Sequence, residues 1–362
     1  MERRPQRLGA LRASLAESGY DALLVTSLPN IRYLTGFSGS NALLVVAAES
    51  ASVLLTDFRY AAQVGDEVGD HARVRIEKAS LWAGLRDAMA PIPDAARVAF
   101  ESAHLLHADY ERLADFALRW QWRPTVGVVE ALRERKDAGE LFLIREAVRI
   151  AEAALQRTVA EVRLGLTERQ VAGILEHHLR DLGSDGTPFE TIVAAGERAA
   201  LPHARASSRE LQGGEFLLID FGASHEGYCS DITRTFALRS VNSEMQEIHD
   251  IVREANLSAS GGVRAGMRGR DADALARGYI DARGYGDAFG HSLGHGIGLE
   301  VHEGPRLAKT ADAPLPVGAV VTIEPGIYRP GWGGVRIEDN VHLAADGPEL
   351  LTSFPRELMV IG

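Results

Sequence analysis

Hydrophobic residues in the first third of the chain switch between helical spacing and short unbroken runs. Leu8, Leu11 and Leu15 recur at helical spacing before Gly19, which predicts a first helix over residues 7–18. Short apolar runs and two further helical patterns, at 81–89 and 107–118, then alternate along the chain. The runs are Ala22–Val25, Ala42–Ala47, Val53–Leu55 and Val98–Phe100. Together they predict a small α/β domain.

A charged segment at residues 131–140 separates this region from a long helical pattern that passes through Ile144 and Leu155. A chain of 362 residues is also longer than one hydrophobic core usually serves. We therefore predict an amino-terminal domain over residues 1–130 and a second domain over residues 131–362.

Two segments of the first domain, residues 29–41 and 56–60, are more polar or richer in glycine than their surroundings and are predicted to be loops at a domain interface. Ordinary turns between strands explain them equally well. Arg32 and Arg59 lie in these segments and are the candidate functional residues of this domain.

The second domain contains an internal repeat. Leu211–Gly222 and Leu315–Gly326 match at a constant offset of 104 residues, and in this match Asp220 corresponds to Glu324. Each copy ends an apolar strand on an acid. A duplicated half-domain of this kind predicts a site between the halves, where the acids converge.

Each acid also belongs to a predicted hairpin. A turn centred between residues 225 and 226 would place Asp220 directly opposite Asp231, and a turn centred on Gly331 would place Glu324 opposite Glu338. Four carboxylates gathered in an apolar sheet are costly unless protons or cations neutralise them. The pattern therefore favours a cation site, although single acids on hairpins are usually surface residues.

Between these hairpins, Phe289–Pro305 carries His291, His295 and His302 among five glycines. A lone His-x-x-x-His is a weak indication of a metal site, because two histidines at this spacing share one face of any helix. Beside four carboxylates, however, one imidazole completes a ligand set suited to Mn²⁺, Co²⁺, Fe²⁺ or Zn²⁺ in a dinuclear centre.

Composition and charge narrow the class of protein. A formal net charge of −11 argues against a nucleic-acid partner. The single cysteine, Cys229, can form no internal disulfide, which fits a reducing cytoplasm, and its expected role is packing. No segment has the unbroken apolar length of an export signal or a membrane span, so no membrane association is expected.

Five of these residues and their surroundings resemble the metal ligands of the Xaa-Pro peptidases, the prolidase and aminopeptidase P branch of the pita-bread metallopeptidases. The residues are Asp220, Asp231, His295, Glu324 and Glu338, in the segments Leu218–Gly222, Ser230–Phe236, Gly294–Leu299, Ile323–Gly326 and Arg336–Asp339. The resemblance implies an α/β (α+β) fold, with a creatinase-like amino-terminal domain before a duplicated pita-bread domain.

The resemblance also implies two divalent metal ions per chain, with manganese favoured over cobalt, zinc or iron. Asp220 would bind one ion, His295 and Glu324 the other, and Asp231 and Glu338 would bridge both. Arg336 is expected to orient a ligand carboxylate.

By the same resemblance, His203, His291 and His302 are expected to contact substrate, and with Glu324 they form the expected catalytic set. For each histidine, a purely structural hydrogen bond is the alternative.

The implied reaction is hydrolysis of the Xaa-Pro bond in short peptides with proline at the second position. Segments 33–41 and 56–60 resemble those of two-domain bacterial aminopeptidases P, so we expect an aminopeptidase rather than a dipeptidase (prolidase). A pita-bread binding module without catalysis is a third interpretation, which the intact ligand set disfavours. A homodimer is expected, as in related enzymes.

Overall fold

The computed structural model describes residues 3–114 and 119–362. The chain forms two compact units, Met1–Arg133 and Glu134–Gly362. The end of the helical pattern predicted at 107–118 lies outside the described residues; the part within them forms α5 (His107–Ala114).

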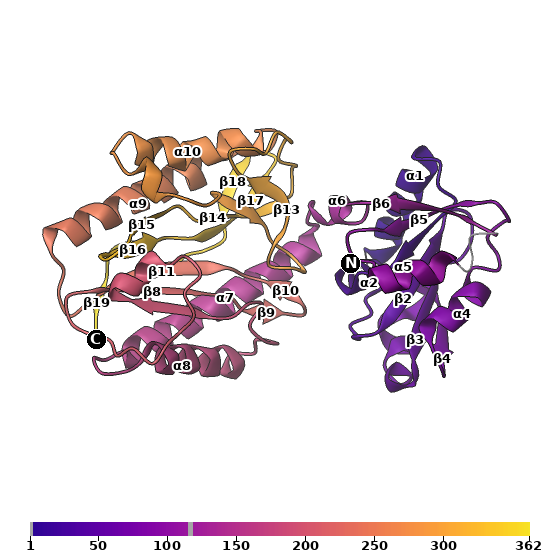
Figure 1. Cartoon of the computed structure of the whole chain (residues 1–362), viewed down its shortest axis with the longest axis horizontal. Coiled ribbons are helices and arrows are strands. Elements are labelled where there is room, and N and C mark those ends of the chain that lie inside the picture. Colours follow the sequence, from indigo (N-terminus) through magenta and orange to yellow (C-terminus); the bar gives the residue numbers. More distant parts are fainter. Residues whose placement is uncertain (1–2, 115–118) are drawn as a thin grey trace. The chain divides into compact units, whose positions relative to one another are not determined.

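The first unit is built around a six-stranded sheet with the order β4-β3-β2-β1-β5-β6 (Figure 1). Strand β2 runs antiparallel to both of its neighbours, and the other pairs are parallel. This arrangement confirms the predicted small α/β domain. The strands are β1 (Ala22–Val25), β2 (Ala42–Ala47), β3 (Val53–Asp57), β4 (Arg73–Glu77), β5 (Arg97–Glu101) and β6 (Gln121–Thr125). The other helices are α1 (Arg4–Glu17), α2 (Leu28–Thr35), α3 (Val64–Val68), α4 (Leu81–Ala88) and α6 (Glu130–Arg133).

Helix α2 corrects the first part of the loop predicted for residues 29–41, whereas residues 36–41 form neither helix nor strand. Pro29 stands in the first turn of the helix, where its missing N–H is tolerated, and Gly36 ends it with a φ of 84°. Ile31 and Leu34 are buried at helical spacing. Polar composition predicted a loop here because the apolar face of so short a helix contains few residues.

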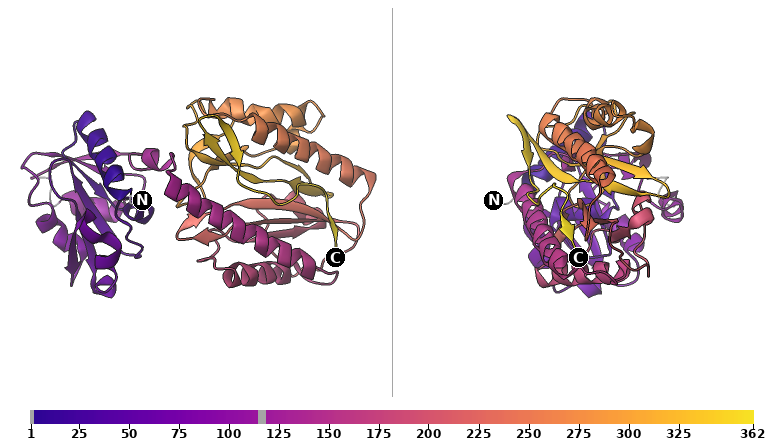
Figure 2. Two further views of the ribbon diagram at one scale, coloured as in Figure 1. Left: turned by 180° about the vertical axis from the view of Figure 1, so that it is seen from behind. Right: turned by 90° about the vertical axis from the view of Figure 1, so that its left-hand side faces the viewer.

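The second unit places its strands between two pairs of helices. Figures 1 and 2 show α7 (Ala138–Glu161) and α8 (Glu168–Asp181) on one side, and α9 (Ser243–Gly262) and α10 (Gly269–Asp281) on the other. One apolar cluster joins α7 and α8 to the nearer strands, and a second cluster does the same for α9 and α10.

Two larger sheets make up the strand layer, with the orders β19-β11-β8-β7 and β13-β12-β14-β17-β18. Strands β9 and β10, and β15 and β16, form two short ladders. The bounds are β7 (Ile192–Ala195), β8 (Phe216–Phe221), β9 (Ser224–His225), β10 (Tyr228–Cys229), β11 (Ile232–Leu238), β12 (Gly294–Gly296), β13 (Glu303–Leu307), β14 (Val320–Ile323), β15 (Gly326–Arg329), β16 (Gly333–Arg336), β17 (Asp339–Ala344), β18 (Gly347–Leu350) and β19 (Val360–Ile361).

The unit is internally duplicated, as predicted. In each half two helices precede a pair of antiparallel strands: α7 and α8 come before β8 and β11, and α9 and α10 before β14 and β17. Strand β8 begins at Phe216 and β14 at Val320, which is the offset found in the sequence.

The register of the first hairpin differs from the prediction. Asp220 lies opposite Thr233, not Asp231. The turn is formed by Glu226 and Gly227, both with positive φ (45° and 79°), so its centre lies one residue beyond the predicted one. Side chains two positions apart on a strand share a face, so Asp231 still lies on the face of Asp220, diagonally across the pair.

The register predicted for the second hairpin is confirmed. Ile323 lies opposite Asp339 and Gly326 opposite Arg336, so that Glu324 and Glu338 occupy corresponding positions between these pairs. Within the described residues, no helix is both long enough and apolar enough to cross a membrane.

Candidate active site

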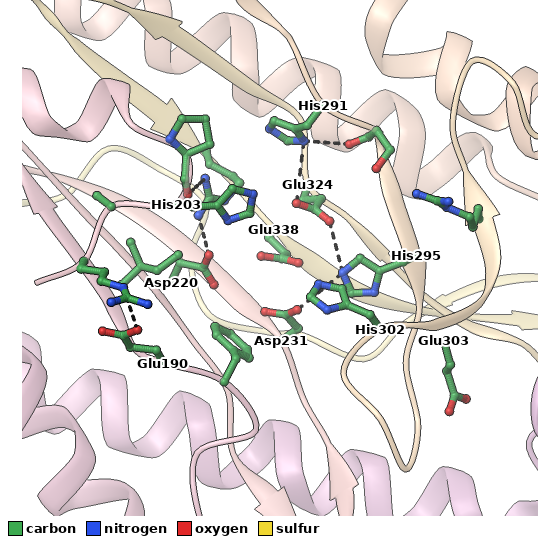
Figure 3. A pocket seen from close by; sticks show the side chains of 18 of the residues that line it. Glu190, His203, Asp220, Asp231, His291, His295, His302, Glu303, Glu324 and Glu338 are labelled. Atoms are coloured by element: carbon green, nitrogen blue, oxygen red, sulfur yellow. Dashed lines mark hydrogen bonds and ion pairs between the residues drawn. The ribbon is translucent and has the colours of Figure 1, made fainter. Parts of the chain in front are cut away.

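The predicted site residues line one cavity of about 890 Å³ in the second unit (Figure 3). Its walls include all five predicted metal ligands and all three predicted substrate histidines, namely His203, Asp220, Asp231, His291, His295, His302, Glu324 and Glu338. The structure thus brings together residues that are more than 130 positions apart in the sequence.

Three of the acids lie where the strands are interrupted. Asp231 falls between β10 and β11, Glu324 between β14 and β15, and Glu338 between β16 and β17. At these breaks the main chain bonds across the site: the N–H of Glu324 donates to Leu293 O at 2.8 Å, and that of Glu338 to Thr233 O at 3.1 Å. The apolar flanking residues had predicted unbroken strands over Tyr228–Phe236 and Val335–Val341, so the sequence did not indicate the breaks at Asp231 and Glu338.

Asp231, His295 and Glu338 form a close group of potential ligands. One ligand atom from each lies within 4.8 Å of the others. His295 Nε2 is 3.7 Å from Asp231 Oδ2 and 3.4 Å from Glu324 Oε1. Asp220 lies on the same cavity wall, where its carboxylate accepts a hydrogen bond from Arg336.

The ring of His295 is oriented as a metal ligand requires. Its Nδ1 lies 3.0 Å from Gly296 O and must carry the proton, which leaves the Nε2 lone pair facing the carboxylates. Burial lowers the pKa of His295 to about 4, so the ring is neutral at pH 7.

Protein groups offset little of the negative charge of the buried carboxylates. Burial raises the pKa of Glu324 to about 8. It also raises the pKa values of Asp231 and Glu338 well above their usual range, and repulsion from Glu338 on Asp231, and from Glu324 on Glu338, adds to the effect. Among the described residues, Oδ1 of Asp220 and Oδ1 of Asp231 are buried without a hydrogen-bond partner.

This donor set fits divalent cations. It combines several buried carboxylate oxygens, two of them without partners, with one neutral imidazole nitrogen, and such hard, oxygen-rich sets suit Mn²⁺ and similar ions. Bound cations would supply the positive charge that the buried carboxylates need.

A hydrogen-bonded chain links Asp220 to His291 along one side of the cavity. Arg336 donates to Asp220 and, at 2.8 Å, to the hydroxyl of Tyr328. That hydroxyl lies 2.8 Å from His291 Nε2, while His291 Nδ1 lies 2.8 Å from Ser292 O. Since Nδ1 must donate to the carbonyl, Tyr328 donates to Nε2. Both nitrogens of His291 therefore have protein partners, as in the structural alternative considered for it.

Tyr328 was not recognised from the sequence. It is buried, and burial raises its pKa to about 12, so its hydroxyl keeps its proton. Its position four residues after Glu324 was the available signal, but only the fold of β15 against β16 turns the hydroxyl toward Arg336.

His203 and His302 line the cavity as His291 does, but they are exposed whereas His291 is half-buried. The ring of His302 packs against that of His295 with centroids 4.4 Å apart. Partial burial lowers the pKa of His302. These two rings can reach a ligand in the cavity without first breaking a hydrogen bond within the described part of the chain.

The loop that carries His291 is fixed from α10. Arg277 donates to Phe289 O and His291 O at 2.7 and 2.6 Å, and Asp273 accepts the N–H of Leu293 at 3.0 Å. Asp273 and Arg277 also pair with each other across one helical turn. The i,i+4 spacing of Asp273 and Arg277 can be read from the sequence, but their bonds to the loop that carries His291 cannot.

Two other predictions concern residues outside this cavity. Cys229 is buried in a small apolar cluster with Ile144, Ile297 and Val320, in agreement with a packing role. In the first unit, Nε and Nη2 of the Arg59 guanidinium donate to the Asp57 carboxylate, each at 2.8 Å. This ion pair raises the pKa of Arg59, and a substrate carboxylate would have to compete with it.

Two known protein families match the two units of the chain. Residues 143–345 match the model of metallopeptidase family M24, and residues 7–135 match the creatinase/prolidase N-terminal domain. The chain belongs to metallopeptidase family M24. It is therefore an enzyme of the pita-bread class, and family membership implies the use of divalent metal.

Individual relatives agree over nearly the whole chain. The Xaa-Pro dipeptidase of Pyrococcus horikoshii is 35% identical and covers 95% of both chains. A solved Xaa-Pro dipeptidase from Bacillus anthracis superposes with a TM-score of 0.94 at 38% identity, covering 99% of this chain and 100% of that one. An X-Pro aminopeptidase from Thermotoga maritima gives a TM-score of 0.90 at 38% identity, covering 98% and 99%.

Proposed function

We propose that this M24 peptidase is a metal-dependent Xaa-Pro dipeptidase. Asp220, Asp231, His295, Glu324 and Glu338 would hold two divalent ions. The dipeptidases among its relatives favour this activity over the aminopeptidase expected from the sequence.

The position of Arg306 supports a dipeptidase in particular. Arg306 lies directly opposite His295 on the neighbouring strand β13, so the two side chains share one face, and it lines the cavity. Of the three arginines in the cavity wall, Arg336 bonds to Asp220 and Arg205 pairs with Glu190. Within the described residues Arg306 has no acidic partner. A dipeptide ends in a carboxylate directly after proline, where this guanidinium could bind it.

The protein's own groups suit the reaction. When bound, the ions polarise an amide carbonyl and lower the pKa of water enough to supply hydroxide near pH 7. Glu324 would move a proton toward the departing proline nitrogen, and His302 would donate to the amide oxygen as charge develops on it. His203 would contact the substrate. Because this amide nitrogen has no N–H, proline must be recognised by shape, for which the apolar cavity residues Phe189, Ile192 and Pro202 are available.

Hydrolysis of Ala-Pro and Ala-Pro-Ala by the Mn²⁺-loaded enzyme tests the proposal. We expect Ala-Pro to be the better substrate, and Arg306→Ala to lower its kcat/KM by about 10- to 100-fold, roughly 1.5–3 kcal/mol for a charge-assisted hydrogen bond. Ala-Pro-Ala should lose much less, because its carboxylate lies one residue farther out. Arg205→Ala is the matched control, since that arginine already has an acidic partner.

An aminopeptidase remains the second candidate, on the observation that the Thermotoga maritima X-Pro aminopeptidase has the same fold over almost the full chain. Cleavage of Ala-Pro-Ala at least as fast as Ala-Pro, with equal effects of Arg306→Ala on both, would support this activity and reject the dipeptidase.

A further inference from the structure

Asn256 on α9 is fully buried behind Glu324 and Glu338 and does not line the cavity. Its side-chain nitrogen donates two hydrogen bonds, to Ile323 O at 3.0 Å and to Ile337 O at 3.1 Å. Ile323 immediately precedes Glu324, and Ile337 immediately precedes Glu338. One amide group therefore holds the two peptide groups from which both glutamates extend.

The orientation of this amide follows from its surroundings. Two carbonyl oxygens face it, and only the NH₂ end of an asparagine can donate to both. Among the described residues, its own oxygen is buried without a partner. An asparagine that leaves its acceptor unsatisfied is maintained at a cost, which the two donated bonds must offset.

The two peptide groups need such a tie because both lie where the strands are interrupted. Strand β14 ends at Ile323, and Ile337 lies between β16 and β17. Burial opposes ionisation of both carboxylates that follow these residues, and repulsion from Glu324 also raises the pKa of Glu338. Without a link between the two segments, repulsion would widen the gap between Glu324 and Glu338.

The other half of the unit has comparable links to Asp231. Ser230, which precedes Asp231, donates through Oγ to Ala147 O on α7 at 3.2 Å. Asn340 donates through Nδ2 to Asp231 O at 2.6 Å. Hydrogen bonds thus hold the chain at or next to Asp231, Glu324 and Glu338. Asn256 differs from Ser230 and Asn340 because it bonds beside two of these acids at once.

We propose that Asn256 is a positioning residue of the metal centre, which keeps Glu324 and Glu338 at the separation that cation binding requires. The inference rests on the proposed metal ligands. Residues that orient ligands from behind typically change metal affinity by 10- to 100-fold when removed.

The test is a Co²⁺ titration of the metal-free protein, followed by visible absorption of the bound ion. We expect Asn256→Leu, which removes both donors at similar volume, to bind Co²⁺ about 10- to 100-fold more weakly than the unmodified protein. Asn256→Gln keeps the amide and should recover most of the affinity. If the Leu variant is unfolded by circular dichroism, Asn256→Ser, which has a single donor, takes its place with the same expectation.

Val252→Ala is the matched control. Val252 is fully buried one turn earlier on α9, and its truncation loosens packing without removing a hydrogen bond. It should lower the urea midpoint but leave Co²⁺ affinity unchanged. Unchanged affinity in the Asn256 variants, or an equal loss in Val252→Ala, would overturn the inference. Absence of Co²⁺ binding by the unmodified protein would instead reject the proposed metal centre.

Discussion

Among the cavity histidines, His302 is the one best placed to act on the reacting amide. It is exposed to the cavity, it packs against the ring of His295, and the described residues do not occupy its nitrogens with hydrogen bonds. His291, by contrast, bonds to Ser292 and Tyr328 through both nitrogens. The two residues should therefore respond differently to substitution.

We predict that His302→Ala lowers kcat for Ala-Pro by on the order of 100-fold with little change in KM. The reason is that a donor to the amide oxygen is most effective when charge develops there in the transition state. Steady-state kinetics at saturating Mn²⁺ measure both constants. A rise in KM at unchanged kcat would mean that His302 only binds substrate.

At the scale of single residues, the sequence indicates a candidate site residue only where the residues next to it form a recognisable motif. The five predicted ligands, His291 and His302 stand in short motifs of glycine, acidic and apolar residues, and His203 stands in the segment Leu201–Arg205. Asn256 has no such pattern, because the two carbonyls that it holds are 67 and 81 positions away. Tyr328 could not be assigned either, since its partners depend on how β15 turns against β16.

Helix α9 also carries His249, a buried group that makes this element sensitive to acid. His249 is 1% exposed, and burial lowers its pKa to about 4 from a usual value of 6.5. Between these two values the unfolded chain binds the proton and the folded chain does not. The free energy of unfolding therefore falls as the pH drops from about 6.5 toward 4 and is unaffected by this group at higher pH.

We predict that His249 removes about 2 kcal/mol of stability between pH 7 and pH 5. Urea unfolding of the metal-free protein at both pH values, for the unmodified chain and for His249→Gln, measures this difference. The Gln variant should lose less stability over the interval, whatever its stability at pH 7. Parallel losses in the two proteins would show that His249 does not titrate in this range.

At the level of elements, apolar runs predicted some strands with their correct ends, such as β1 and β2. Register was harder to predict. The register predicted for the second hairpin, with its turn at Gly331, was correct. The register predicted for the first was wrong by one residue in its turn, because the Glu226–Gly227 turn has its centre one residue farther on. Helix α2 was missed because it is short and its sequence is rich in turn residues.

At the scale of the whole molecule, the site depends on the duplication of the second unit. Asp220 and Asp231 come from the first half, and His295, Glu324 and Glu338 from the second. The halves are joined beside the site by buried bonds such as those from Arg234 to Glu338 O and Asp339. The sequence repeat predicted that the acids would meet, but it contained no information on these links.

The most direct test of the proposed dinuclear centre is a titration of the metal-free chain with Mn²⁺, in which bound metal and Ala-Pro hydrolysis are measured on the same samples. Such a centre predicts no hydrolysis after chelation and a plateau of activity at two ions per chain. It also predicts that Asp231→Asn stays inactive at every Mn²⁺ concentration while retaining its circular dichroism spectrum. Ala-Pro hydrolysis by the chelated protein, or full activity of Asp231→Asn, would contradict it.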